Sequence, residues 1–192
     1  DKMAPSYDEA ILNKFKNGEE GYTDYDWYDL FMKDWTVNQN HNLTVRGGTN
    51  NIKFFTSVAF NDDQGLLKSN IGWYKRTNIR NNLTAKLTDN LELQVGSSIR
   101  LDDRRQNREE FIWNYKTLLV NERGKGWHTM ENENHYSYLA PEGKNLAALI
   151  DPDVDGYNET QNRRFENTAT LTYKAPFLEG LTASAQVAYD FR

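Results

Sequence analysis

The chain has 192 residues, with 23 lysines and arginines against 28 aspartates and glutamates, and a net charge of −5. This acidic balance argues against a nucleic-acid partner, because binding phosphates requires a basic face. No apolar run approaches the ~18 residues that a membrane-spanning helix needs. Membrane-spanning strands are not excluded, because only their alternate residues must be apolar. The lack of cysteine excludes disulfides, thiolate metal sites and cysteine nucleophiles.

The first forty residues predict a loop that carries short helices. A capping box over residues 6–9, which begins at Ser6, opens a helix that Gly18 ends. A second short helix is expected over residues 27–31, with Asp24 or Asp26 as its cap. Apolar residues are few in both helices, so we expect them to pack against another part of the protein.

From residue 41 the hydrophobic period changes to two, which is typical of strands. Leu83 lies on the apolar face of one predicted strand, and Arg80 and Lys86 lie on its polar face. This alternation fits barrel strands in a membrane, and it also fits a soluble antiparallel sandwich whose apolar faces form the core. The predicted strands cover residues 41–46, 52–60, 76–87, 91–101, 164–174 and 181–191.

The connections between these strands alternate between short and long. Tight turns are expected at 47–50, 88–90 and 176–180, and long connections at 61–72 and 102–162, the latter with a helix over 108–121. Short turns at one end and long loops at the other are typical of an outer-membrane barrel. Strands of about ten residues, at ~3.3 Å each and tilted by ~45°, span roughly 23 Å, close to the ~25 Å apolar band of such barrels. Aromatic residues also gather near the strand ends, so the pattern favours the barrel over the sandwich.

Two stretches resemble a known family: YDWYDLF at 25–31 and NHNLTVRGGT at 40–49 are similar to TDWYD…HNLSVSGGT of SusC/RagA-type TonB-linked outer-membrane proteins. The resemblance extends over nearly the whole chain, through FFTSV at 54–58, DQG at 63–65, KRTNIRNNL at 75–83, TDNLELQVG at 88–96, NLAAL at 145–149 and PFLEGL at 176–181. It implies an all-β fold: an antiparallel transmembrane β-barrel segment, about six strands of a larger barrel, with long loops carrying short helices.

The resemblance also implies an organisation of the chain into four parts. These are an extracellular loop with short helices (1–40), four barrel strands (41–101), a long extracellular loop with one helix (102–162) and two further barrel strands (163–192). Six strands cannot close a membrane barrel, whose minimum is about eight, so we expect a fragment without the plug and TonB-box segment of the family. In a membrane the polar strand faces must line the lumen, because an arginine at the bilayer midplane costs roughly 2–4 kcal/mol.

Members of this family import nutrients across the outer membrane, driven by the TonB complex and capped by a SusD-like surface lipoprotein. The resemblance therefore implies an outer-membrane transporter for oligosaccharides or peptides, in contact with membrane lipid, with no catalysis and no cofactor. The alternatives are a soluble, secreted β-sandwich that binds glycans through exposed aromatic residues, and an outer-membrane barrel enzyme. No Ser/His/Asp arrangement or phosphate-binding glycine loop supports the enzyme.

Two groups of residues are candidates for substrate binding. Arg46, Arg80 and Arg100 lie on the polar faces of predicted strands, where we expect them to line the lumen. Trp113, Trp127 and Tyr138 lie in the long loop, where aromatic rings can stack on a sugar or contact a lid protein. For any single one of these residues, packing of the loop against its own helix is the favoured interpretation.

One acidic stretch matches the start of a calcium loop. Asp151, Asp153 and Asp155 occupy the first, third and fifth positions, and Gly156 occupies the sixth. The twelfth position is Asn162 instead of a bidentate glutamate, and no flanking helices are evident. The pattern therefore predicts either a weak calcium site or a surface turn rich in aspartate.

Overall fold

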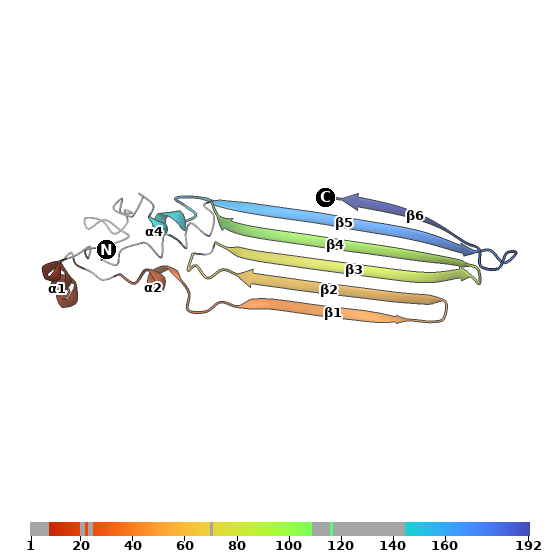
Figure 1. The fold of residues 1–192 in the computed structure, drawn as a ribbon, viewed down its shortest axis with the longest axis horizontal. Helices are drawn as coiled ribbons and strands as arrows, with labels where there is room; N and C mark the ends of the chain where they lie inside the picture. The colour runs from red at the N-terminus through yellow and green to blue at the C-terminus, as the bar shows by residue number, and fades with distance from the viewer. Residues whose placement is uncertain (1–7, 20–21, 23–24, 70, 109–115, 117–144) are drawn as a thin grey trace, which may run out of the picture. The chain divides into compact units, whose positions relative to one another are not determined.

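The fold is all-β, with six antiparallel strands in one sheet (Figure 1). The structure, a computed structural model, describes residues 8–19, 22, 25–69, 71–108, 116 and 145–192. In the sheet the strands follow their order in the chain: β1 (Asn38–Gly48), β2 (Ile52–Gln64), β3 (Trp73–Thr88), β4 (Leu91–Asn107), β5 (Tyr157–Lys174) and β6 (Thr182–Phe191). Over the described residues, no helix is both long enough and apolar enough to cross a membrane.

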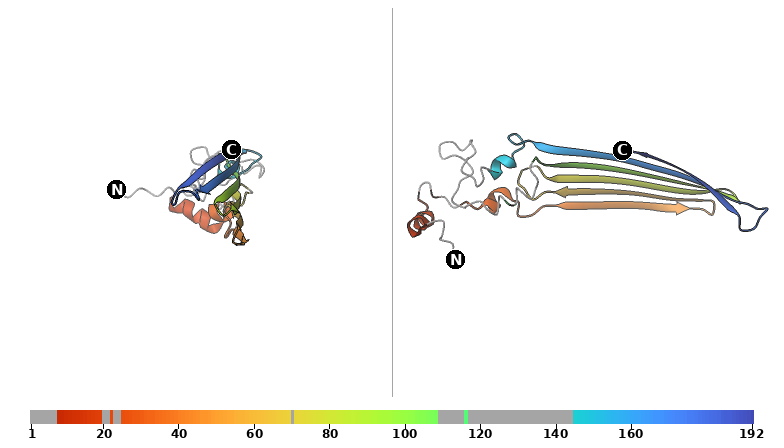
Figure 2. Two further views of the ribbon diagram at one scale, coloured as in Figure 1. Left: turned by 90° about the vertical axis from the view of Figure 1, so that its right-hand side faces the viewer. Right: turned by 45° about the horizontal axis from the view of Figure 1, so that its top comes forward.

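The strand register confirms the predicted separation into an apolar and a polar face. Leu43 on β1 lies opposite Val58 on β2, which in turn lies opposite Ile79 on β3. One residue along each strand, Thr44, Ser57 and Arg80 form the corresponding row on the other face. Successive side chains of a strand point to opposite faces, so the alternation in the sequence becomes two chemically different surfaces. Figure 2 shows the sheet from two further directions, with β1 and β6 at its edges.

The apolar face of the sheet is exposed. A soluble sandwich would bury Leu83, Leu171 and Val187 together, but these side chains are 40%, 41% and 71% exposed. The buried apolar residues that the structure describes all lie outside the six strands: Trp27, Leu67, Ile71, Ala147 and Ile150. The described strands form a single layer, so the sheet does not have the two-layer core that the sandwich requires.

The three short turns form as predicted. Between β1 and β2, the Thr49 hydroxyl accepts the backbone N–H groups of Asn51 and Ile52. Gly48 has a φ of 152°, and a Cβ there would lie 2.2 Å from the Ile52 carbonyl oxygen, so only glycine fits. The Thr88 hydroxyl accepts the N–H of Asn90 in the β3–β4 turn, and residues 175–181 close the β5–β6 turn.

The strands are longer than predicted and extend beyond the strand ranges expected from the sequence. β1 begins at Asn38, β2 continues through Gln64, β4 continues through Asn107, and β5 begins at Tyr157. The predicted loops at 61–72 and 102–162 therefore shorten to 65–72 and 108–156. These strand ends are polar on both faces and show no alternation, whereas the backbone ladder that pairs Asn38 with Asp63 requires no apolar residue.

The remaining residues form a second compact unit, which we call the connection unit: residues 1–36, 65–72 and 105–158, as far as they are described. Helix α1 (Glu9–Asn17) ends at Gly18 as predicted, but its cap is Asp8, whose carboxylate accepts the N–H of Ile11 at 2.8 Å. The capping box was predicted to begin two residues earlier, at Ser6, which lies outside the described residues.

Helix α2 (Trp27–Phe31) is capped by Asp26, as predicted, and a third short helix, α4, covers Leu146–Leu149. Trp27, Leu67 and Ile150 form a small buried core, and Phe31 and Met32 pack against it. Both N-terminal helices were expected to pack on another part of the protein, and α2 does so through Trp27. The helix predicted over 108–121 falls almost entirely outside the described residues.

Candidate functional site

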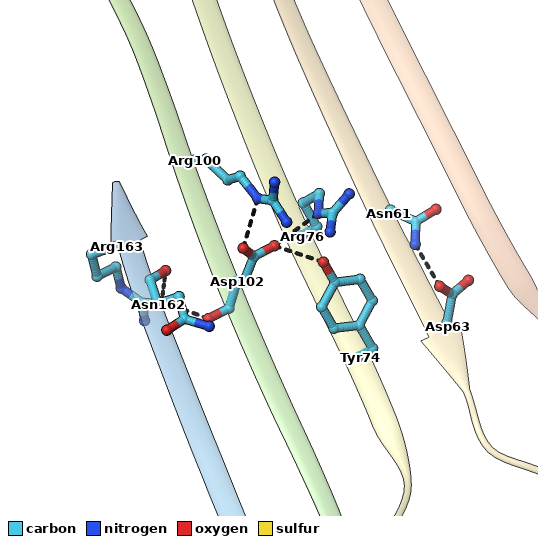
Figure 3. Close-up of polar contacts among 8 residues, drawn as sticks. All are labelled: Asn61, Asp63, Tyr74, Arg76, Arg100, Asp102, Asn162 and Arg163. Atoms are coloured by element: carbon cyan, nitrogen blue, oxygen red, sulfur yellow. Dashed lines mark hydrogen bonds and ion pairs between the residues drawn. The ribbon is translucent and has the colours of Figure 1, made fainter. Parts of the chain in front are cut away.

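A buried carboxylate organises the polar face of the sheet. Asp102 on β4 is only 8% exposed. It accepts the Tyr74 hydroxyl at 2.7 Å, and the Nε atoms of Arg76 and Arg100 at 2.8 Å and 2.7 Å (Figure 3). A carboxylate is tolerated away from water only when charged or hydrogen-bonding partners surround it, and here three donors from two strands do so. We call Tyr74, Arg76, Arg100 and Asp102 the Asp102 cluster.

Further charged contacts continue from this cluster onto β5. Arg163 donates from Nη1 to the Asp102 carbonyl oxygen at 3.1 Å, and its Nη2 lies 2.7 Å from the Asp103 carboxylate. The Nε of Arg164 lies 2.7 Å from the Glu166 carboxylate. Figure 3 shows Arg163 on β5, and its hydrogen bond to the Asp102 carbonyl oxygen joins β5 to β4. The ends of β3, β4 and β5 therefore carry a network of hydrogen bonds and ion pairs.

A cavity of ≈ 350 Å³ opens beside the Asp102 cluster. It is lined by Arg100, Asp102, Gln161, Asn162, Arg163, Arg164 and Arg192. Four of these residues are arginines and one is acidic, although the chain as a whole is acidic. Guanidinium groups bind planar anions through paired N–H donors, so this cavity can hold an anionic group.

A second cavity, of ≈ 430 Å³, lies in the connection unit and has the opposite charge. It is lined by Asp26, Tyr28, Asp29, Met32, Lys33, Asp34 and Leu66. The Asp26 carboxylate accepts the N–H groups of Tyr28 and Asp29 as the cap of α2. The backbone carbonyl of Asp29 accepts the Lys68 ammonium. These bonds hold α2 and the β2–β3 connection together within the unit, so they explain the polar lining in structural terms.

The structure separates the three arginines that were predicted to line a lumen. All three lie on the polar face, but only Arg100 belongs to the Asp102 cluster. Arg80 lies opposite Ser57, about 13 Å along β3 from Arg76 at ~3.3 Å per residue. Arg46 lies opposite Phe55, toward the short turns. A role of these arginines in substrate binding stays a prediction, and Trp113, Trp127 and Tyr138 lie outside the described residues.

Sequence reasoning missed most of the cluster. The sequence pattern places Asp102 at the start of a loop, and it does not distinguish Tyr74 and Arg76 from the other residues near the start of their strand. The signal in the sequence is weak, because the two-residue period of apolar residues ends at Leu101 and residues 102–105 are all charged. A strand end with polar residues on both faces hides this period from a hydrophobic pattern.

The acidic stretch predicted as a calcium loop forms a hydrogen-bonded turn. The Asp151 carboxylate accepts the N–H of Asp153 at 2.9 Å. The Asp151 carbonyl oxygen accepts the N–H groups of Val154 and Asp155. Among the residues that the structure describes, no three His, Cys, Asp or Glu side chains are grouped so that they hold a metal ion. Calcium binding stays a prediction, which calorimetric titration with Ca²⁺ would test.

The fold and the cluster define a class of structure: one antiparallel sheet with an exposed apolar face and a charged polar face. No family model and no curated protein matches the sequence. Among solved structures, the chain is similar to one chain of the RagAB peptide transporter, with a TM-score of 0.61 and 15% sequence identity. The match covers 95% of this chain and 22% of that chain, so the present chain spans under a quarter of its length. At this identity the likeness shows the fold.

Proposed function

We propose that the chain is part of the barrel wall of an outer-membrane transporter that imports oligosaccharides or peptides. The observation that carries this proposal is the apolar face, which stays exposed over six adjacent strands and lies opposite a face rich in charge. In a bilayer the apolar face contacts lipid and the charged face lines a wetted lumen. The fold shared with a chain of a peptide transporter supports this assignment.

The energetics favour only one orientation of the sheet. Turning the polar face outward would expose Arg80 to hydrocarbon, at roughly 2–4 kcal/mol for an arginine near the midplane. The opposite orientation exposes residues such as Leu83 and Val187, which hydrocarbon accommodates without cost. In this orientation Arg46, Arg80, Arg100 and the Asp102 cluster face the lumen.

The proposed mechanism is binding and passage without a chemical step. Polar side chains of the lumen and aromatic residues of the long loop (Trp113, Trp127 and Tyr138) contact the substrate. The short turns face the periplasm, and the connections at 65–72 and 108–156 face outward. The resemblance at 25–31 and 40–49 supports a SusD-like surface lipoprotein as the lid and the TonB complex as the energy source.

Uptake by cells that produce the full-length protein tests this function. We expect deletion of the gene to abolish uptake of a labelled peptide or oligosaccharide pool, and loss of TonB to have the same effect. Restoring the full-length gene should restore uptake. Unchanged uptake in both deletions would contradict the proposal. Recovery of the protein as a detergent-free monomer from the soluble fraction would instead favour the secreted glycan-binding sandwich.

A further inference from the structure

We infer that the arginine-lined cavity beside the Asp102 cluster binds a carboxylate group of the transported substrate. The inference rests on the proposed function and adds to it the chemistry of the cargo: an anionic peptide or an acidic oligosaccharide. It uses the cavity lined by Arg100, Arg163, Arg164 and Arg192, with Asp102 at its side.

The charge of the cavity is the first observation. Four arginines and one aspartate line it, which gives a formal charge of +3. If Arg76, Asp103 and Glu166, which form ion pairs with these residues, are included, two positive charges remain in excess. Asp190, opposite Glu166 in the register, reduces this excess without removing it. A positive surplus in a chain of net charge −5 is a local feature that attracts anions.

The second observation is the way in which the guanidinium groups are held. The contacts of Arg76 and Arg100 with Asp102 run through the Nε atom of each group (Figure 3). The terminal Nη donors of Arg100 thus lie outside its contact with the carboxylate. A guanidinium that is already fixed loses less conformational entropy when it binds a second anion, and its paired donors match the two oxygens of a carboxylate.

The remaining arginines supply donors from β5 and from the end of β6. Arg164 forms an ion pair with Glu166. Within the described residues, Arg192 lines the cavity and forms no hydrogen bond or ion pair. Arg100 and Arg164 are 43% and 42% exposed at the side chain, so a ligand in the lumen can reach them. An incoming carboxylate would meet donors from two or three strands at once.

A binding measurement with matched probes tests this inference. Full-length protein containing this chain is purified in detergent and immobilised. It is then offered a glutamate-containing peptide pool with free C-termini and the same pool with glutamine for glutamate and amidated C-termini. A second pair consists of uronate-containing oligosaccharides and their carboxyl-reduced forms. Mass spectrometry of the captured material gives the ratio of the charged to the neutral member of each pair.

We expect the charged member of one pair to be enriched about tenfold, as charge-assisted hydrogen bonds predict. Arg164→Gln and Arg192→Gln should reduce that enrichment, whereas Arg104→Gln should preserve it. Arg104 is a matched control because it is exposed on β4 and does not line the cavity. Whichever pair shows the enrichment also decides between a peptide and an oligosaccharide as the source of the carboxylate.

Three results would overturn the inference: equal capture of both members, no capture of any pool, or an enrichment that survives both cavity substitutions. The uptake experiment reports on the proposed function separately. A protein that supports TonB-dependent uptake without a preference for charge refutes only the carboxylate site, whereas a protein that supports no uptake refutes the transporter itself.

Discussion

The connection unit buries several apolar side chains, whereas the sheet leaves its apolar side chains exposed. In the connection unit, Trp27, Leu67 and Ile150 come from three distant parts of the sequence and bury one another. In the sheet, residues such as Leu83 and Val187 remain exposed. The comparison shows that the connection unit carries its own buried core, whereas the described strands leave their apolar face exposed.

The largest effect is expected from the core of the connection unit. Trp27→Ala should destabilise that unit by about 3–5 kcal/mol, because it removes a large aromatic side chain that is 4% exposed. Trp35→Ala is the matched control, since Trp35 is 73% exposed. Limited proteolysis of the full-length protein in lipid vesicles should show faster cleavage of the connections in Trp27→Ala alone, with the strands still protected. Equal cleavage of both variants would contradict the assigned core.

The next effect separates the two faces of the sheet. Leu83→Arg should destabilise the full-length protein in bilayers by about 2–4 kcal/mol, because it places a charge in hydrocarbon. Asn82→Arg, one residue away on the polar face, should have little effect. Denaturant unfolding of both variants in lipid vesicles measures the difference. Similar stabilities for the two variants would mean that the face of Leu83 does not contact lipid.

A smaller effect is expected from the Asp102 cluster. Asp102→Asn leaves Arg76 and Arg100 without their shared carboxylate and should cost about 2 kcal/mol. The arginine side chains are 35% and 43% exposed, so water offsets part of the lost charge interaction. Asp190→Asn changes an exposed aspartate and serves as the control in the same unfolding experiment. If Asp102→Asn lost no more stability than Asp190→Asn, the cluster would not stabilise the sheet.

The strands could be predicted from the sequence in their central parts and not at their ends. Leu43, Val58 and Ile79 alternate with polar neighbours, and that local pattern is sufficient to assign their face. Asp102 and Asp63 lie where both faces of the strand are polar. Their strand pairing depends on the neighbouring strands, and a local sequence pattern contains no information about those strands.

The connection unit was least predictable for a related reason. Its core joins residues 27, 67 and 150, and no short-range period links positions so far apart. The Asp102 cluster likewise combines residues 26 and 28 positions apart along the chain. The register of β3 against β4 brings them together, and only the folded sheet reveals it.

The smallest effect concerns a polar pair on the apolar face. The Ser97 hydroxyl donates to the Asn167 side-chain oxygen at 2.9 Å, and Asn167 lies opposite Tyr189. Ser97→Ala or Asn167→Leu alone should cost about 1 kcal/mol, because each leaves its partner unsatisfied. The double variant should recover that loss, since no polar group then remains unpaired. A double-mutant cycle in vesicles measures this coupling, and strictly additive effects would contradict the pair.

Side-chain accessibility to oxygen and to an aqueous nickel chelate tests the central claim most directly. The chain contains no cysteine, so single nitroxide labels can be attached at Leu83→Cys and Leu171→Cys on one face and at Arg80→Cys and Thr170→Cys on the other. In the full-length protein in bilayers, with any cysteines elsewhere replaced, the first two labels should collide with oxygen and be protected from the chelate. The other two labels should collide with the chelate. Labels at Leu83 and Leu171 that are shielded from both reagents would reveal a protein core and contradict the account.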